Sequence, residues 1–157
     1  LLRISKESFD ALSFNCYALS PDHEKMNHAL EISGLPMIIG EYHFGTVDRG
    51  LAQSLWQVNS QKERGDAFRY YTENAFAHRG LIGTGWLRWI DQNINGRTDG
   101  ENYNCGFIDV TDRPYPYMVD AAIETAKSLY EIHSGTKTPF HQAPNAVGHS
   151  PIPDLWE

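Results

Sequence analysis

The chain has 157 residues and a formal net charge of −7 at pH 7, with 41% hydrophobic and 21% charged residues. This length suits a single domain with a sizeable core, and the composition is ordinary for a soluble globular protein. Nucleic acids and anionic membranes both require clustered Lys and Arg, so the acidic balance argues against either as a partner. It also disfavours a heavily sulfated polymer, and a neutral ligand is therefore expected.

The two cysteines, Cys16 and Cys105, are too few for a disulfide framework or a zinc site, and the sequence leaves open whether they are bridged. No apolar run approaches the roughly 18 residues of a membrane span. Residues 1–7 lack the basic start and the long apolar stretch of a signal peptide. Because the sequence starts without Met, we expect it to begin inside a domain, with any targeting segment upstream.

The first predicted elements are a strand, a helix and a second strand. Phe9–Tyr17 is a short apolar run with aromatic residues, which is typical of a buried strand. Ser20 suits the N-cap of the next helix, with Pro21 at its first position and Gly34 as its C-terminal stop. Leu35–Glu41 is apolar and β-branched, so a second strand is expected there.

A second helix and a third strand follow an irregular stretch at 42–59. Ser60 and Glu63 have the spacing of a capping box, and apolar residues continue at helical spacing to a stop at Gly80. Leu81–Ile90 is the third apolar run and predicts a strand.

The rest of the chain is a polar loop at 91–114, a helix that begins at Pro116, and an irregular segment at 136–157. Three successive strand–helix units predict parallel strands with crossover helices. The long connections follow the strands, as in a (β/α)8 TIM barrel, whose active site lies at the carboxyl ends of the strands. We therefore expect an α/β fold that forms part of such a barrel. The alternative is a small doubly wound α/β domain, although no Gly-rich phosphate loop follows any strand.

Glu41 is the strongest candidate for a catalytic residue. It ends an apolar strand, and strand alternation places it on one inward face with Met37 and Ile39. Burying a carboxylate in such company is costly unless it has partners, so a catalytic role would explain its presence. The alternative is a structural glutamate that pairs with a nearby Arg.

Side chains near the ends of the other strands could bind a sugar. Trp86 can stack on the apolar face of a sugar ring or fill the core, which is the role expected of Trp89. Tyr17, with Asn15 on the same face of its strand, can donate a hydrogen bond into the same mouth or serve only in packing.

The loop after the third strand offers amides and carboxylates, which suit sugar hydroxyls because these need both donors and acceptors. The residues concerned are Asp91, Gln92, Glu101 and Asn102. Asp99 and Glu101 lack the full spacing of a calcium-binding EF-hand, and no HExxH motif or His cluster is present. No metal and no other cofactor is expected.

Three motifs occur in a fixed order along the chain. They are Ile38-Ile39-Gly40-Glu41-Tyr42-His43-Phe44-Gly45 with Asp48-Arg49-Gly50, then Gly83-Thr84-Gly85-Trp86 with Asp91-Gln92, and finally Asp99-Gly100-Glu101-Asn102-Tyr103 with Gly106-Phe107-Ile108-Asp109 and Pro114-Tyr115-Pro116. Together they resemble the nucleophile strand, the eighth strand and the following loop of the β-agarases of glycoside hydrolase family 50. The resemblance runs from about residue 9 to residue 135.

The resemblance implies a clan A (β/α)8 barrel, a retaining mechanism and an agarose-type galactan as substrate. In that register the three strands are the sixth to the eighth, and Glu41 is the nucleophile that ends strand seven. Trp86 takes the sugar-binding position of strand eight, and Tyr17 the strand-six position at which some clan members hold a tyrosine against the nucleophile. The full set of expected substrate-binding residues is Tyr17, Asn15, His43, Trp86, Asp91, Gln92, Glu101 and Asn102.

One part of the family's machinery has no counterpart in this sequence. Its general acid/base is a glutamate after an asparagine at the end of strand four, and a retaining enzyme needs both carboxyls, roughly 5–5.5 Å apart. We therefore expect residues 1–135 to be the C-terminal portion of a glycoside hydrolase barrel, with 136–157 as its tail. The isolated chain is expected to be inactive.

Strands six to eight alone would leave two open sheet edges, so we expect association with the N-terminal part of the barrel or with a second copy. The resemblance also implies a secreted or periplasmic protein. The alternative function is a non-catalytic carbohydrate-binding or scaffold fragment.

Overall fold

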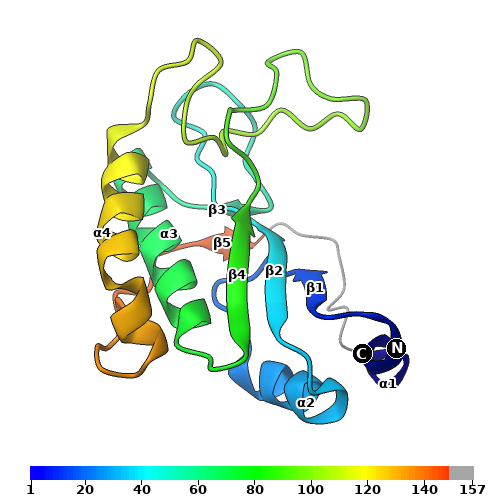
Figure 1. Ribbon diagram of the computed structural model, residues 1–157. Coiled ribbons are helices and arrows are strands. Elements are labelled where there is room, and N and C mark those ends of the chain that lie inside the picture. The colour runs from blue at the N-terminus through cyan, green and yellow to red at the C-terminus, as the bar shows by residue number, and fades with distance from the viewer. Residues whose placement is uncertain (149–157) are drawn as a thin grey trace.

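The computed structural model describes residues 1–148 (Figure 1). The elements in chain order are α1 (Leu2–Ser8), β1 (Leu12–Asn15), α2 (His23–Ser33), β2 (Met37–Tyr42), β3 (Trp56–Gln57), α3 (Gln61–Phe76), β4 (Leu81–Trp86), α4 (Pro116–His133) and β5 (Val147–Gly148). Within this range no helix combines the length and the apolar character needed to cross a membrane.

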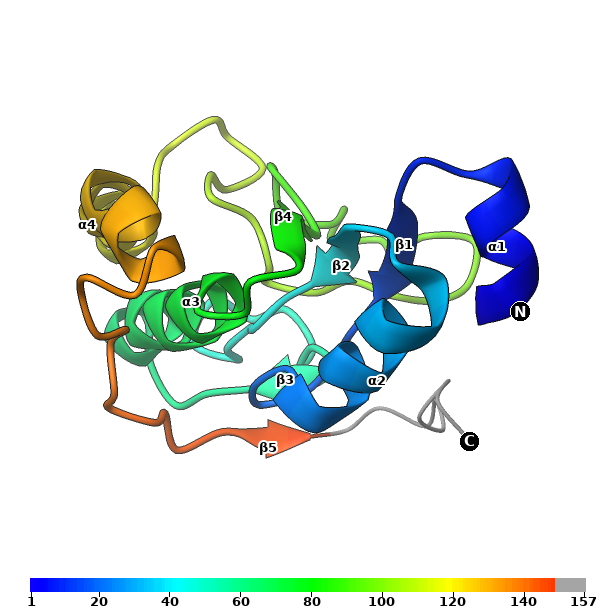
Figure 2. The same ribbon diagram turned by 60° about the horizontal axis from the view of Figure 1, so that its bottom comes forward.

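The main sheet has three parallel strands in the order β1-β2-β4, which confirms the predicted strand–helix–strand pattern. Figure 2 shows α2 and α3 on one side of this sheet, and α4 packs against α3. The core lies between the sheet and these helices. On the other side of β1, Ser13 and Asn15 are exposed, while Leu12 and Phe14 pack against the core.

The middle strand, β2, does not alternate regularly along its length. Met37 and Ile39 are fully buried in the core between sheet and helices, and the pairing register shifts between Ile39 and Tyr42. Tyr42 therefore continues the buried row and stacks on Tyr71 of α3, with ring centroids 4.0 Å apart. The prediction that Glu41 shares a face with Met37 and Ile39 is wrong, because the irregularity turns Glu41 away from the core.

Capping residues in the sequence correctly predicted several of the helix ends. Gly34 ends α2 in the left-handed conformation at φ 67°, and Pro116 opens α4, as predicted. The Ser60 side chain accepts from the N–H of Glu63 and begins α3. The N-cap of α2 is Asp22 and not Ser20, because the Asp22 carboxylate accepts from two helix N–H groups.

Other expected boundaries were too wide. The first strand covers only Leu12–Asn15, and residues 10–11 before it form a bend that follows the unpredicted helix α1. The third strand stops at Trp86, since the Trp89 carbonyl accepts from the N–H groups of Phe107 and Ile108 in the following loop. The short antiparallel pair β3–β5 was also not predicted. The last part of the expected tail, 149–157, lies outside the described residues.

No disulfide joins Cys16 and Cys105. Burial raises the pKa of the Cys105 thiol to about 12, so this group stays protonated at neutral pH.

Candidate active site

Glu41 lies at the carboxyl end of β2, the middle strand of the sheet. Its backbone is held on one side by the N–H of Cys16, which donates to the Glu41 carbonyl at 2.9 Å. On the other side, β4 lies very close to β2 at Gly85. Any residue with a side chain at position 85 would place its Cβ atom only 2.4 Å from the Gly40 carbonyl oxygen, so this close approach requires glycine. The sheet thus fixes the position of Glu41 from both neighbouring strands.

The side-chain partner of Glu41 is Tyr17, whose hydroxyl donates to Oε2 at 2.8 Å. Burial, the hydrogen bond to Glu41 and the negative charges of Glu41 and Glu101 all raise the pKa of Tyr17. Tyr17 therefore remains a protonated donor. No ion pair to Glu41 occurs within residues 1–148, so the alternative of an Arg partner finds no support there.

The backbone of Tyr17 is itself tied to a distant segment. The indole N–H of Trp56 donates to the Tyr17 carbonyl at 2.8 Å, and Trp56 is the first residue of β3. The segment that carries Tyr17 is thus tied to β3.

His43 lies two residues after Glu41 and is only 1% exposed. Its Nε2 accepts from the Leu55 N–H at 3.1 Å, so Nδ1 carries the proton and donates to the Leu87 carbonyl, also at 3.1 Å. Burial lowers the pKa of His43 to about 4, and the ring is neutral at pH 7. The ring packs edge-on against Tyr17 at 5.0 Å. His43 thus uses both nitrogens to hold the polypeptide around the site.

This geometry predicts an acid-sensitive fold. The unfolded chain binds a proton at His43 below its ordinary pKa of 6.5, while the folded chain resists it until about pH 4. The contribution of the neutral ring to the free energy of unfolding is therefore complete above pH 6.5 and falls by up to about 3 kcal/mol towards pH 4. Urea unfolding at several pH values should show a flatter profile for His43→Gln. The control is His28→Gln at an exposed position, which should leave the pH profile unchanged. If His43→Gln also left the profile unchanged, a lowered pKa of His43 would be excluded.

Trp86 and Trp89 differ in how far they are buried. Trp86 is partly buried, its indole N–H donates to the Cys105 carbonyl at 2.6 Å, and its ring lies 5.5 Å from that of Phe68 on α3. Trp89, expected in the core, is 69% exposed and stacks on Phe107. The structure therefore gives Trp86 a packing role, and only the accessible part of its ring is left for a sugar.

Asp91 is buried, and both of its carboxylate oxygens are taken by the protein. The Asn104 amide reaches Oδ1 and Oδ2 at 2.9 and 2.8 Å, the Gly106 N–H donates to Oδ1 at 2.7 Å, and the Tyr115 hydroxyl donates to Oδ2 at 2.6 Å. Arg64, also buried, donates to the carbonyls of Asn104 and Gly106 at 2.9 and 2.8 Å. This network fixes the loop after β4.

Sequence reasoning missed Arg64, although a signal was present. A buried stripe of α3 has the helical spacing of Gln61, Arg64, Phe68, Tyr71 and Ala75. A charged residue in the middle of such a stripe needs buried partners, and the polar loop was the available source.

Gln92 and Asn102 also make their bonds to the protein. Gln92 is fully buried, donates to Glu101 Oε2 at 2.8 Å and accepts from the Tyr103 N–H at 2.7 Å. Asn102 accepts from the Ala52 N–H through its backbone and its side chain, at 3.2 and 3.3 Å. These two residues hold the segment that carries Glu101 and Tyr103.

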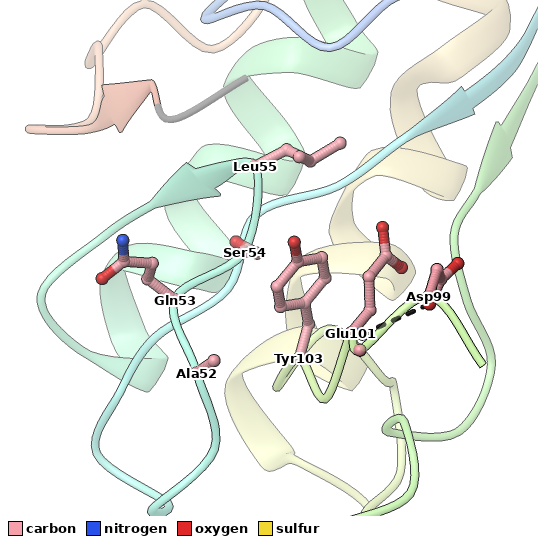
Figure 3. Close-up of a pocket in the computed structure, with 8 residues that line it drawn as sticks. Ala52, Gln53, Ser54, Leu55, Asp99, Glu101 and Tyr103 are labelled. Atoms are coloured by element: carbon pink, nitrogen blue, oxygen red, sulfur yellow. Dashed lines mark hydrogen bonds between the residues drawn. The ribbon is translucent and has the colours of Figure 1, made fainter. Parts of the chain in front are cut away.

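Of the remaining candidates, Asn15 is exposed beside β2, and a Cβ atom at Gly40 would lie 2.9 Å from its Oδ1. Glu101 lines a pocket between two loops (Figure 3). Within residues 1–148 no group of three or more His, Cys, Asp or Glu side chains is placed to hold a metal ion. The structure therefore brings Glu41, Tyr17, His43 and Glu101 to one end of the sheet.

In α/β folds with parallel strands, ligand and active sites lie at the carboxyl ends of the strands, and Glu41 and Tyr17 lie at that end of this sheet. The chain matches no family model. It is 38% identical to β-agarase A and 36% identical to β-agarase B of Vibrio sp. (strain JT0107), each over 128 residues. These matches cover 77% of this chain and 13% of each agarase, so the chain spans about an eighth of the relatives' length.

Solved structures give the same result. The chain is similar to an exo-β-agarase with a TM-score of 0.79 and 35% identity, over 84% of this chain and 18% of that protein. A second agarase matches with a TM-score of 0.79 and 36% identity, over 84% of this chain and 21% of that one. A further family 50 protein matches at 40% identity with a TM-score of 0.77, over 81% of this chain and 18% of that protein. The chain is homologous to the β-agarases of glycoside hydrolase family 50, which confirms the resemblance expected from its motifs.

Proposed function

We propose that this chain contributes the catalytic nucleophile, Glu41, to a retaining β-glycoside hydrolase that acts on a neutral galactan of the agarose type. The observation that carries the proposal is the hydrogen bond from Tyr17 to Glu41 at the carboxyl end of β2. The relatives named β-agarases support the substrate class. Because the chain spans only 13% of them, the activity belongs to the natural polypeptide that contains these residues.

Further parts of the proposal concern architecture. We propose that β1, β2 and β4 are strands six to eight of a (β/α)8 barrel and that residues 1–135 form its C-terminal portion. In this arrangement the acid/base carboxyl comes from a part of the polypeptide outside these 157 residues. Secretion or export to the periplasm is also part of the proposal, since a galactan polymer is met outside the cytoplasm.

The chemistry follows from the two oxygens of Glu41. Tyr17 donates to Oε2, which leaves Oε1 to attack the anomeric carbon. As the Oε1–carbon bond forms, the glycosidic bond breaks, and the leaving oxygen takes a proton from the acid/base group. A water molecule then gives that group a proton and attacks the same carbon, releasing Glu41. Two inversions retain the β configuration.

The other residues act around this step. Asn15 is exposed and lies opposite Glu41 in the strand register, and in this proposal it binds a hydroxyl of the substrate. The Trp86 ring packs edge-on against the buried Tyr42, with ring centroids 5.1 Å apart, and the part of the ring that stays accessible is the part proposed to contact a sugar. Asp91, Gln92, Asn102 and His43 are positioning residues in this proposal, because their polar atoms bind the protein's own loops.

The stereochemistry of the product tests the mechanism. We expect the natural polypeptide to hydrolyse a neutral agaro-oligosaccharide and to release the β anomer first, as followed by proton NMR immediately after mixing. An α anomer released first would exclude a nucleophilic Glu41. Binding without hydrolysis would instead support the carbohydrate-binding alternative.

A further inference from the structure

A cavity of about 380 Å³ lies between two loops at the mouth of the candidate site. One wall is the segment 52–55, and the other carries Asp99, Glu101 and Tyr103 (Figure 3). The walls are joined by the two hydrogen bonds between Asn102 and the Ala52 N–H. The volume falls in the range of roughly 300–1,000 Å³ that is usual for small-molecule sites. The cavity is therefore preformed and large enough for a ligand.

Contacts connect this cavity to the nucleophile. The Tyr103 ring lies 5.8 Å from that of His43, which lies 5.0 Å from that of Tyr17, the partner of Glu41. The Glu101 charge also contributes to the raised pKa of Tyr17. Leu55, on the opposite wall, donates its N–H to His43. The cavity thus adjoins the reaction site.

Two polar groups in the cavity wall have unused hydrogen-bonding capacity. Glu101 Oε2 accepts from Gln92 at 2.8 Å and from Arg97 at 3.3 Å, whereas Oε1 accepts none from residues 1–148. The Tyr103 hydroxyl makes none within the same residues, and burial and the nearby charge of Glu101 raise its pKa, so it stays a donor. Figure 3 shows both side chains pointing the same way. The wall therefore presents one fixed acceptor beside one donor.

We propose that this cavity is a sugar-binding subsite next to the bond that is cleaved, in which Glu101 and Tyr103 bind neighbouring hydroxyls of an uncharged sugar residue. Each hydroxyl can both donate and accept, which matches this pair of groups. Asp99 and Glu101 both line the cavity and share a single ion-pair partner within residues 1–148, Arg97, at 3.0 and 3.3 Å, so the group keeps a net negative charge that disfavours a sulfated sugar. The subsite would thus select neutral galactan over its sulfated forms. This inference rests on the proposed function.

Titration calorimetry in the natural polypeptide tests the subsite, with Glu41→Gln as the parent so that no substrate is consumed. The probes are a neutral agaro-oligosaccharide and a sulfated galactan oligosaccharide of equal length. We expect Glu101→Ala to weaken binding of the neutral probe about tenfold or more, since a hydrogen bond to a charged group is lost. Tyr103→Phe should weaken it several-fold. Glu101→Gln should narrow the preference for the neutral probe.

The control is Glu31→Gln, which removes the same charge from an exposed position on α2 and should leave both affinities unchanged. Melting temperatures of all variants identify any loss of folding, and Tyr103→Phe remains informative if Glu101→Ala does not fold. Unchanged affinity in folded Glu101→Ala and Tyr103→Phe would overturn the subsite and leave the proposed function intact. A parent that binds no neutral oligosaccharide would overturn both.

Discussion

Glu41→Gln in the natural polypeptide is expected to lower the rate of galactan hydrolysis by several orders of magnitude. The amide keeps the size of the side chain but is a poor nucleophile, so the glycosyl–enzyme bond does not form. Tyr17 can still donate to the amide oxygen at this position, and oligosaccharide affinity should remain close to that of the unaltered protein. Steady-state kinetics together with calorimetry measure the two effects separately.

The matching chemical test is Glu41→Gly with added azide, which can enter the space left by the side chain. We expect activity to return with a glycosyl azide of inverted configuration as product. The control is Glu31→Gln. Glu31 lies on α2, away from the candidate site, so this variant should retain full activity. If Glu41→Gln hydrolysed substrate at nearly the original rate, Glu41 would not be the nucleophile.

Asp91→Ala is expected to lower the free energy of unfolding by about 3–5 kcal/mol, more than any other substitution proposed for this chain. The substitution leaves Asn104, Gly106 and Tyr115 without their buried acceptor. It also removes the Asp91 charge, which stabilises the charged form of the buried Arg64 guanidinium more than any other nearby charge does. Urea denaturation of the natural polypeptide measures the loss.

Asp10→Ala is the control for this prediction, because the Asp10 side chain is exposed. We expect its free energy of unfolding to stay within about 0.5 kcal/mol of the original. A loss below about 1 kcal/mol in Asp91→Ala would show that the loop after β4 is held by other contacts.

The parts of the fold that were predictable are those controlled by neighbouring residues. Gly34, Ser60 and Pro116 act within one turn of their own helix, and each lies where the sequence placed it. The parallel order of the strands followed from the alternation of strands and helices. These features need no knowledge of the tertiary structure.

The side on which a residue lies was less predictable. Glu41 leaves the buried face because the pairing register of β2 shifts between Ile39 and Tyr42, and strand alternation alone cannot indicate such a shift. Trp86 and Trp89 differ in exposure because the chain leaves the sheet between them to bond with its own loop. The polar residues of that loop suggested ligand binding, yet Asp91 and Gln92 bind other parts of the protein. Long-range contacts determine all three outcomes.

The contacts of Trp56 link the far end of the described chain to the chemistry. Its backbone pairs with Gly148 in β5, while its indole bonds to Tyr17. A Cβ atom at position 148 would lie 2.9 Å from the Trp56 ring, so a larger residue there would displace the indole. Such a change, more than a hundred residues from Glu41 in sequence, is expected to disturb the indole bond to Tyr17, whose hydroxyl donates to Glu41. Position 148 is therefore expected to influence the candidate site from a distance, through Trp56 and Tyr17.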